Sequence, residues 1–228
     1  MSKNKKKLDD SEVLIEKPDI PALESTQKIN SSGELEKIKE DVESYYNLNI
    51  VNCNISVIKG MAIESSYVRS STVSQSVIER FDVIDVQFRG CNFTNVQWKY
   101  SNFSRVEFIA CKFTGANFVS NDFKNCSFID CQCELVQLNS SKCMKVRFEN
   151  CMMKDILFFD SQLRSTLISK CIAHGMTLSN TDYNLLNICG SEIDGLQVNF
   201  EIFCQSNVTL DLIQAAYLLE HFTSLKVV

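Results

Sequence analysis

Cysteine and histidine side chains are the first candidates for chemistry in this sequence, because thiolates and imidazoles act as nucleophiles and bind metal ions. The chain has 228 residues with eleven Cys, but its only two His are His174 and His221. Cys131-Gln132-Cys133 brings two thiols together, yet no His or further Cys pair accompanies them to complete a tetrahedral zinc set. A Cys–His nucleophile also needs both groups on one accessible surface. We therefore predict no metal site and expect both His to be ordinary solvated residues.

Other motifs of catalysis and of membrane insertion are missing from the sequence. No Gly-x-Gly or Gly-Lys-Ser/Thr stretch is present to cradle a phosphate. No run of 18 apolar residues could form a membrane span, and the basic start of the chain leads into Leu8-Asp9-Asp10 instead of an apolar secretory segment. The net charge of −5 is too small to indicate a polyanion binder. We predict a non-enzymatic cytoplasmic protein without cofactors, whose thiols are reduced.

A five-residue hydrophobic period determines how these side chains are positioned. Stepping by fives from Ile58 to Val208 meets an apolar residue at every position. A second column, two residues earlier in each unit, holds mostly small or medium side chains. Its members from 86 to 151 are Val86, Cys91, Val96, Ser101, Val106, Cys111, Ala116, Asn121, Cys126, Cys131, Val136, Ser141, Val146 and Cys151. Six cysteines (91, 111, 126, 131, 151 and 171) fall in this column and three (53, 133 and 143) in the large one, so nine thiols are predicted to point inward.

The period excludes both regular secondary structures, because a helix repeats every 3.6 residues and a strand every two. Two inward residues separated by one polar residue form a very short strand, and the other two residues turn the chain. Four such units close a square coil of about twenty residues, and stacked coils pair their backbones about 4.8 Å apart. The sequence therefore predicts a solenoid whose axis is filled by ladders of stacked side chains.

At this point the sequence resembles the pentapeptide-repeat family, whose unit is a small residue, Asn or Asp, Leu or Phe, and two variable residues. The units that carry the resemblance are Cys91-Asn92-Phe93-Thr94-Asn95, Ser101-Asn102-Phe103, Ala116-Asn117-Phe118 and Cys126-Ser127-Phe128. The resemblance implies an all-β solenoid, a right-handed quadrilateral β-helix with short capping helices at both ends. After residue 150 the polar central residue is replaced by Met152, Leu157 and Leu167, which form either ordinary surface or a contact face.

The chain divides into four segments on this interpretation. Residues 1–30 are polar and carry both prolines, so we expect a flexible tail. Residues 31–57 form an N-terminal cap and entry, in which Ser31 and Glu34 resemble a capping box and a helix is predicted over 34–46. Residues 58–205 are the repeats, and 206–228 are a capping or dimerisation helix that shields the open backbone edge.

The C-terminal helix carries the predicted dimer seam. Its apolar face is expected to contain Leu210, Ile213, Tyr217 and Leu218. In the gyrase-protecting (Qnr-type) members of the family a comparable segment joins two rods end to end, and the run 214–220 of this chain is similar to it. The resemblance therefore implies a homodimer.

Two charged surfaces follow from the twenty-residue coil. Arg105 and Lys145 share one corner column and Lys124 and Arg164 share the next, which predicts a basic ridge that is either a solvated edge or an anion-binding stripe. From Cys171 to Leu225 there is no Lys or Arg. The acidic residues there include four proposed for recognition: Asp182, Glu192, Asp194 and Glu201.

Function is expected to come from surface recognition. The gyrase-protecting relatives imply a rod that resembles B-form DNA in girth and negative charge and occupies the DNA saddle of a type II topoisomerase, DNA gyrase or topoisomerase IV. The basic ridge argues against this because it would repel a positive saddle. The alternative is a protein–protein scaffold that holds an unknown partner on its faces or through its N-terminal tail. Direct nucleic-acid binding by the ridge is the least favoured option, since no aromatic platform accompanies it.

Overall fold

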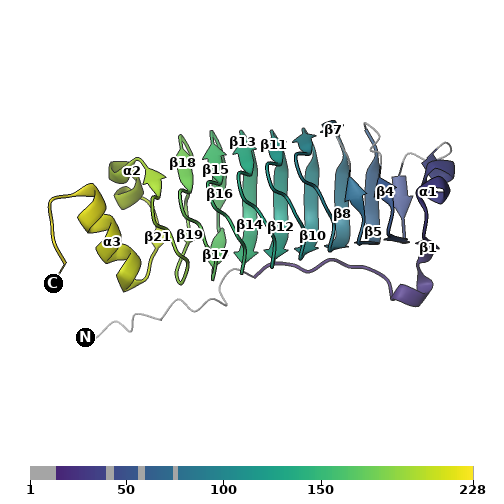
Figure 1. Cartoon of the computed structure of the whole chain (residues 1–228), viewed down its shortest axis with the longest axis horizontal. Helices are drawn as coiled ribbons and strands as arrows, with labels where there is room; N and C mark the ends of the chain where they lie inside the picture. The colour runs from purple at the N-terminus through teal and green to yellow at the C-terminus, as the bar shows by residue number, and fades with distance from the viewer. Residues whose placement is uncertain (1–13, 40–43, 56–59, 74–76, 228) are drawn as a thin grey trace, which may run out of the picture.

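Parallel strands stack side by side into an elongated rod, with helices at its two ends (Figure 1). The computed structural model describes residues 14–39, 44–55, 60–73 and 77–227. Within these residues the strands form three parallel sheets that run along the rod. This confirms the predicted all-β solenoid with capping helices.

The largest sheet holds twelve of the described strands, and its longer strands bend around a corner of the rod at residues such as Arg105. Its strands are β1 (Gln27–Ile29), β2 (Ser44–Tyr46), β3 (Leu48–Val51), β5 (Ala62–Arg69), β8 (Asp82–Arg89), β10 (Asn102–Ile109), β12 (Asp122–Ile129), β14 (Lys142–Glu149), β16 (Gln162–Arg164), β17 (Leu167–Ser169), β19 (Leu186–Asn187) and β21 (Val208–Thr209).

The other two sheets consist of shorter strands. One contains β7 (Val77–Glu79), β9 (Gln97–Lys99), β11 (Asn117–Val119), β13 (Gln137–Asn139), β15 (Leu157–Phe159), β18 (Thr177–Ser179) and β20 (Gln197–Val198). The other pairs β4 (Asn54–Ile55) with β6 (Thr72–Val73) and continues as single bridges from Thr72 to Glu192.

The pairing register repeats every twenty residues through the body of the rod. Phe103 pairs with Val83 and Phe123, and the same step leads from Ala62 to Asp82 and from Thr177 to Gln197. The step is shorter at the N-terminal end, where Asn49 pairs with Tyr67. It is longer at the C-terminal end, where Leu186 pairs with Val208 because a helix is inserted between the coils.

Both predicted columns of inward side chains lie in the core. Every large-column residue from Ile63 to Ile193 is buried. The phenylalanines stack face to face along the axis, with ring centroids 5.1 Å apart for Phe88 and Phe108 and 4.8 Å apart for Phe108 and Phe128. These distances match the spacing between paired strands, so the aromatic ladder follows directly from the coil repeat.

The last residue of each unit turns the chain through a corner. Arg105, Ala110, Gly115 and Ser120 all have a positive φ, between 52° and 68°. Four left-handed corners in one coil give the rod four sides. Asn, Asp and Ser occupy many of the equivalent positions, which explains how the fold forms with only seven Gly.

The helix at the N-terminal end is shorter than predicted. Helix α1 runs over Ser32–Lys39; the predicted helix extended to 46, but Tyr45 is buried in strand β2, and residues 40–43 lie outside the described part. The predicted cap is present in part: the Glu34 N–H donates to Ser31 Oγ at 3.2 Å, while the Glu34 carboxylate accepts the N–H of Asn30 at 2.9 Å. Leu35 is buried against the first coils.

The C-terminal end contains two helices where one was predicted. The repeat register assigns residues 200–205 to a coil, but Asn199 caps the short helix α2 (Phe200–Gln205) through a bond from the Ile202 N–H. Helix α3 (Leu212–Phe222) follows, and Asp211 and Gln214 form a capping box at its start. Gln214 also seals the last coil, because its buried Nε2 donates to the carbonyls of Ile188 (2.6 Å) and Ser191 (2.7 Å).

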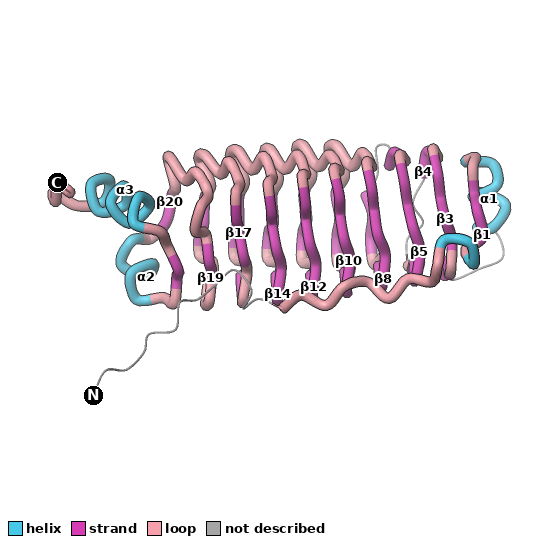
Figure 2. The backbone as a smooth tube through the Cα atoms, turned by 90° about the horizontal axis from the view of Figure 1, so that it is seen from below, coloured by secondary structure: helices cyan, strands magenta, loops and turns pink. Residues whose placement is uncertain are grey.

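Residues 14–30 do not form the expected flexible tail. They run along the large sheet (Figure 2), and the short 3-10 helix η2 (Leu23–Ser25) leads into β1, which pairs with β3. The remainder of the predicted tail, 1–13, lies outside the described residues.

Candidate interaction surfaces

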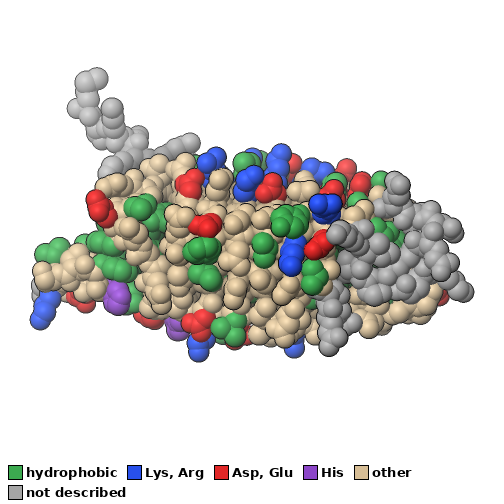
Figure 3. Space-filling model, turned by 90° about the horizontal axis from the view of Figure 1, so that it is seen from above, with side chains coloured by type: hydrophobic (Ala, Val, Ile, Leu, Met, Phe, Trp, Pro, Cys, Tyr) green, Lys and Arg blue, Asp and Glu red, His purple; other side chains and the backbone are tan. Residues whose placement is uncertain are grey.

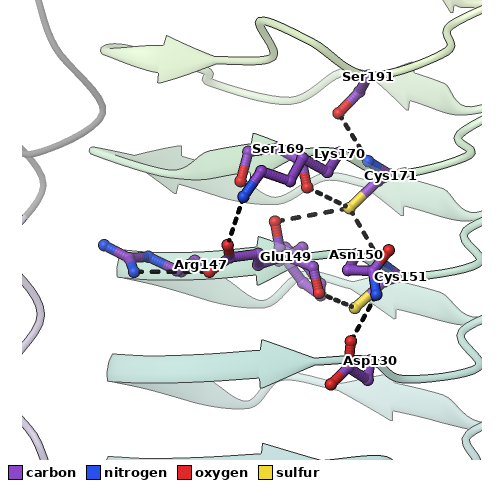
Figure 4. A network of polar contacts seen from close by, with 10 residues as sticks. Asp130, Arg147, Glu149, Asn150, Cys151, Ser169, Lys170, Cys171 and Ser191 are labelled. Carbon is purple, nitrogen blue, oxygen red and sulfur yellow. Dashed lines mark hydrogen bonds and ion pairs between the residues drawn. The ribbon is translucent and has the colours of Figure 1, made fainter.

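The thiols are core groups, as predicted. The nine cysteines assigned to the two inward columns are all buried, whereas Cys189 is half-buried and Cys204 is exposed. Figure 4 shows Cys151 and Cys171 in successive coils, where the Cys171 Sγ lies 3.4 Å from the Cys151 nitrogen. Burial raises the pKa of the Cys126 thiol to about 12. At neutral pH such a thiol is protonated and does not act as a nucleophile.

The histidines lie apart from the thiols. The His174 Nε2 is 3.0 Å from Glu192 Oε2 and 3.4 Å from Asp194 Oδ2 on the exposed surface. His221 stacks on Tyr217 in α3, with ring centroids 5.5 Å apart. No group of three or more potential metal ligands occurs among the residues that the structure describes.

The predicted basic ridge is interrupted by carboxylates and by an apolar side chain. Arg105 makes two 2.6 Å bonds to Asp85, directly below it in the previous coil. Arg164 lies 3.2 Å from Asp182. Lys124 and Arg164 are also separated by the exposed Met144, which pairs with both. Charges of both signs are interspersed on the face seen in Figure 3.

Lys145 is the fourth predicted member of the ridge and is exposed at a left-handed corner. Together these positions give a mixed charged surface with two of its four basic groups paired. This arrangement is less favourable for an anion than a continuous stripe, because each paired Arg already has its donors directed at a carboxylate.

The predicted acidic end contains side chains in three different settings. Asp182 is paired with Arg164, and Glu192 and Asp194 flank His174. Glu201 is exposed in the first turn of α2. The side chains of Glu192 and Asp194 are 63% and 72% exposed, so both can contact a partner.

The predicted apolar face of the C-terminal helix is divided between its own rod and solvent. Leu210 precedes α3 and packs on the core, and Leu218 is only 2% exposed. Tyr217 is half-buried, and its hydroxyl accepts the Gly195 N–H at 2.7 Å. Ile213 points the other way and is 83% exposed, next to Leu212 at 89%.

Helices α2 and α3 also border an open apolar pocket of about 290 Å³. Phe200, Phe203, Val208, Leu218 and Leu219 contribute to its lining, and Cys204 borders it. The outward apolar residues further along the rod do not form a single patch: Met152 is exposed, Leu157 is half-buried and Leu167 is buried.

The segment formed by residues 14–21, called the arm below, contributes a surface that the sequence analysis missed. The Asp19 N–H donates to Asp85 Oδ1 at 2.9 Å, and the Tyr67 hydroxyl donates to the Pro21 carbonyl at 3.3 Å. A signal for it was present in the sequence: Ile15, Pro18, Ile20 and Pro21 are apolar residues in an otherwise polar stretch, and all four are half-buried.

The described residues thus define a class of protein: a capped parallel β-solenoid that presents surfaces and carries its thiols inside. No helix in the described part has the length and apolarity needed to cross a bilayer. Residues 101–178 match the family described as the pentapeptide repeat region. The chain therefore contains a pentapeptide repeat region over these residues.

Solved structures include similar rods. Full-length QnrB1, described as a plasmid-mediated fluoroquinolone resistance protein, is 15% identical with a TM-score of 0.47, over 78% of this chain and 99% of that one. HetL, described as involved in heterocyst differentiation regulation in the cyanobacterium Nostoc, is 11% identical with a TM-score of 0.45, over 79% and 94%. No curated protein sequence matches the chain. At these identities and scores the two rods indicate nothing about a partner of this chain.

Proposed function

We propose that this protein acts by surface recognition and that its acidic C-terminal end binds a basic surface on a partner protein. The observation that carries this proposal is the charge distribution: residues 171–225 contain six carboxylates and no Lys or Arg. Glu192 and Asp194 project these charges from the last coils, and the nearby His174 is their only described ion-pair partner. Like charges concentrated at one end of a rod steer it toward a surface of opposite charge.

A type II topoisomerase, gyrase or topoisomerase IV, is the first candidate partner. The candidate comes from the resemblance to the gyrase-protecting members of the family, whose rods mimic DNA. The interrupted ridge supports it, since pairing of Arg105 with Asp85 and of Arg164 with Asp182 reduces the positive charge that would repel a DNA-binding saddle.

A dimer through α3 would place two acidic ends next to each other. Leu212 and Ile213 are the most exposed apolar residues of α3 and are therefore available for such a contact. Leu218 stabilises its own rod instead, since it is buried against the last coil. Burying exposed aliphatic side chains contributes roughly 1.5–3 kcal/mol for each one, so the double variant Leu212→Ser/Ile213→Ser is expected to be monomeric.

The test is a gyrase supercoiling assay with and without a quinolone, titrated with the purified protein. We expect the protein either to inhibit supercoiling or to restore supercoiling in the presence of the quinolone. We expect Glu192→Lys/Asp194→Lys to abolish either effect. The matched control is Asp122→Lys/Asp130→Lys, which changes the net charge by the same amount at exposed positions in the middle of the rod. Equal loss in both variants would indicate a general charge effect and contradict recognition by the acidic end.

A protein–protein scaffold is the second candidate, and the arm is the observation that favours it. Residues 14–21 already rest on the large sheet as an extended peptide. If gyrase activity is unaffected at high concentrations of folded protein, the rod's partner is to be sought through the sheet face that the arm covers.

A further inference from the structure

The arm crosses successive coils of the large sheet while making few specific contacts. Figures 1 and 2 both place it alongside β8, β10, β12 and β14. Its two described hydrogen bonds to the sheet are those of the Asp19 N–H to Asp85 and of the Tyr67 hydroxyl to Pro21. Residues 14–21 form no β-strand, so no backbone ladder holds them. A segment bound in this way can be exchanged for another extended peptide.

The first residues of the arm leave space beneath them. A cavity of about 270 Å³ lies between Leu14–Lys17 and the sheet, where Glu107, Ser127, Ile129 and Arg147 line it. Leu14 does not fill this cavity, because it is 76% exposed. The sheet therefore offers more room at this point than the arm uses.

Arg147 is the group in this cavity whose donors are incompletely satisfied. Its Nε is buried without a hydrogen-bond partner, and one terminal nitrogen lies 3.7 Å from Glu149. In Figure 4 its guanidinium extends away from the thiol column. The neighbouring carboxylates have other partners, since Gln87 donates to Glu107 at 3.0 Å and Lys170 lies 3.1 Å from Glu149. An unpaired guanidinium donor beside an open cavity favours a carboxylate ligand.

The charged residues along the rest of the arm also favour an acidic segment at this face. Hydrogen bonding to Asp85 raises the pKa of Arg105, and the arm carboxylates Glu16 and Asp19 add to that effect. With Glu16 and Asp19 against Lys17, the arm supplies a net charge of −1 to this part of the sheet. A segment that replaced it would need carboxylates at similar positions to leave Arg105 equally well balanced.

We propose that the sheet face under the arm binds an extended acidic segment of a partner protein, one of whose carboxylates enters the cavity and pairs with Arg147, and that the arm occupies this face until the segment displaces it. The arm is tethered and competes at an effective concentration on the order of millimolar. Only a segment that binds the uncovered face more tightly than this can displace it. A substitution that weakens binding of the arm should therefore increase the apparent affinity of the sheet face for an acidic peptide added as a separate molecule.

The full-length Asp19→Pro variant tests this because it removes the N–H donated to Asp85. The probe is a fluorescein-labelled peptide with the sequence of residues 14–21, whose own Glu and Asp supply the carboxylates. We expect anisotropy titrations to show binding about tenfold tighter to Asp19→Pro than to the wild type, the change that loss of one charge-assisted bond produces. Asp19→Ala is the matched control, since it retains the N–H and should give the smaller gain.

The role of Arg147 is tested in the Asp19→Pro background. Arg147→Glu should reverse the gain in affinity, whereas Arg147→Lys, which keeps the charge, should retain part of it. Equal binding to Asp19→Pro and the wild type would overturn the proposal, as would binding that is unchanged by Arg147→Glu. Self-association of Asp19→Pro in light scattering without peptide would also overturn it, because the occupant would then be a second copy of this chain.

Discussion

The buried Asn121 is predicted to be essential for the stability of the central coils. It belongs to the column of small inward residues and is fully buried. Its Oδ1 accepts the Ser101 N–H at 2.9 Å, and its Nδ2 donates to the Trp98 carbonyl at 2.9 Å. Asn121→Ala would leave the Ser101 amide without this acceptor and the Trp98 carbonyl without this donor, both in the interior of the rod.

The magnitude follows from these two bonds. An orphaned buried amide costs about 1–3 kcal/mol and the lost bond to the carbonyl about 1 kcal/mol, so Asn121→Ala should destabilise the protein by about 2–4 kcal/mol. Asn121→Ser should cost less than half as much, because Ser141 makes the equivalent contacts one coil away. Its Oγ accepts the Asn121 N–H at 3.2 Å and donates to the Phe118 carbonyl at 3.3 Å.

Urea unfolding of the two variants provides the measurement. Trp98 is the only Trp and lies buried beside Asn121, so its fluorescence reports on these coils while circular dichroism reports on the whole rod. With a slope of about 2–3 kcal/mol per molar urea, Asn121→Ala should lower the midpoint by about 1 M. A loss below about 1 kcal/mol, or an equal loss in Asn121→Ser, would refute the argument from unsatisfied groups.

Three further predictions concern pH, the C-terminal cap and the thiols. Burial acts to raise the pKa of Asp85, but hydrogen bonds from Arg105 and the Asp19 amide outweigh it and lower that pKa. The stabilisation from this pair should therefore be complete at neutral pH and be lost as pH falls through the lowered pKa, which urea unfolding from pH 7 downward will show as a decline that Asp85→Asn lacks. Asp211→Ala removes the α3 cap and the acceptor of the Gly190 N–H, so it should cost about 1–2 kcal/mol in thermal unfolding, and Asp211→Asn should cost less. Titration of the native protein with a thiol reagent should modify Cys204 rapidly and leave the nine buried cysteines unreacted until urea is added; fast reaction of several thiols would contradict their inward position.

The aromatic ladder and the thiol column have one origin, the five-residue repeat. A corner every fifth residue places chemically similar side chains at the same level of successive coils, where Phe stacks on Phe and Cys on Cys. The thiols therefore replace other small residues in the core, as Ser101 and Asn121 also do. Their number therefore reflects packing in the core.

Some contacts could have been predicted by extending the same coil arithmetic. Asp85 stands twenty residues before Arg105, so the repeat itself places the acid beneath the base. Asp182 stands 18 residues after Arg164, which is close to one coil, so the same arithmetic places these two side chains near each other. The positions of the basic residues alone suggest a continuous ridge. The positions of basic and acidic residues together, assigned to the same columns, predict the ion pairs.

The C-terminal end shows where a periodic pattern stops being sufficient. Phe203 continues the five-residue register and is buried as expected, yet it lies in α2. An apolar residue in register can fill the core whether its backbone is helical or forms part of a coil. The five-residue pattern therefore does not distinguish a helix from a coil at this position. The same ambiguity applies to α3, where Leu218 faces the rod and Ile213 faces solvent.

The sequence by itself determined the coil, its twenty-residue length, the inward thiols and the polar outer surface, because all of these depend on contacts between residues at fixed spacings. Only the tertiary structure placed the arm on the large sheet, inserted α2 after Asn199 and divided the faces of α3. These features join segments without a common period. Their energies come from a few side chains that meet only once the rod has formed, such as Tyr67 with Pro21 and Gln214 with the carbonyls of the last coil.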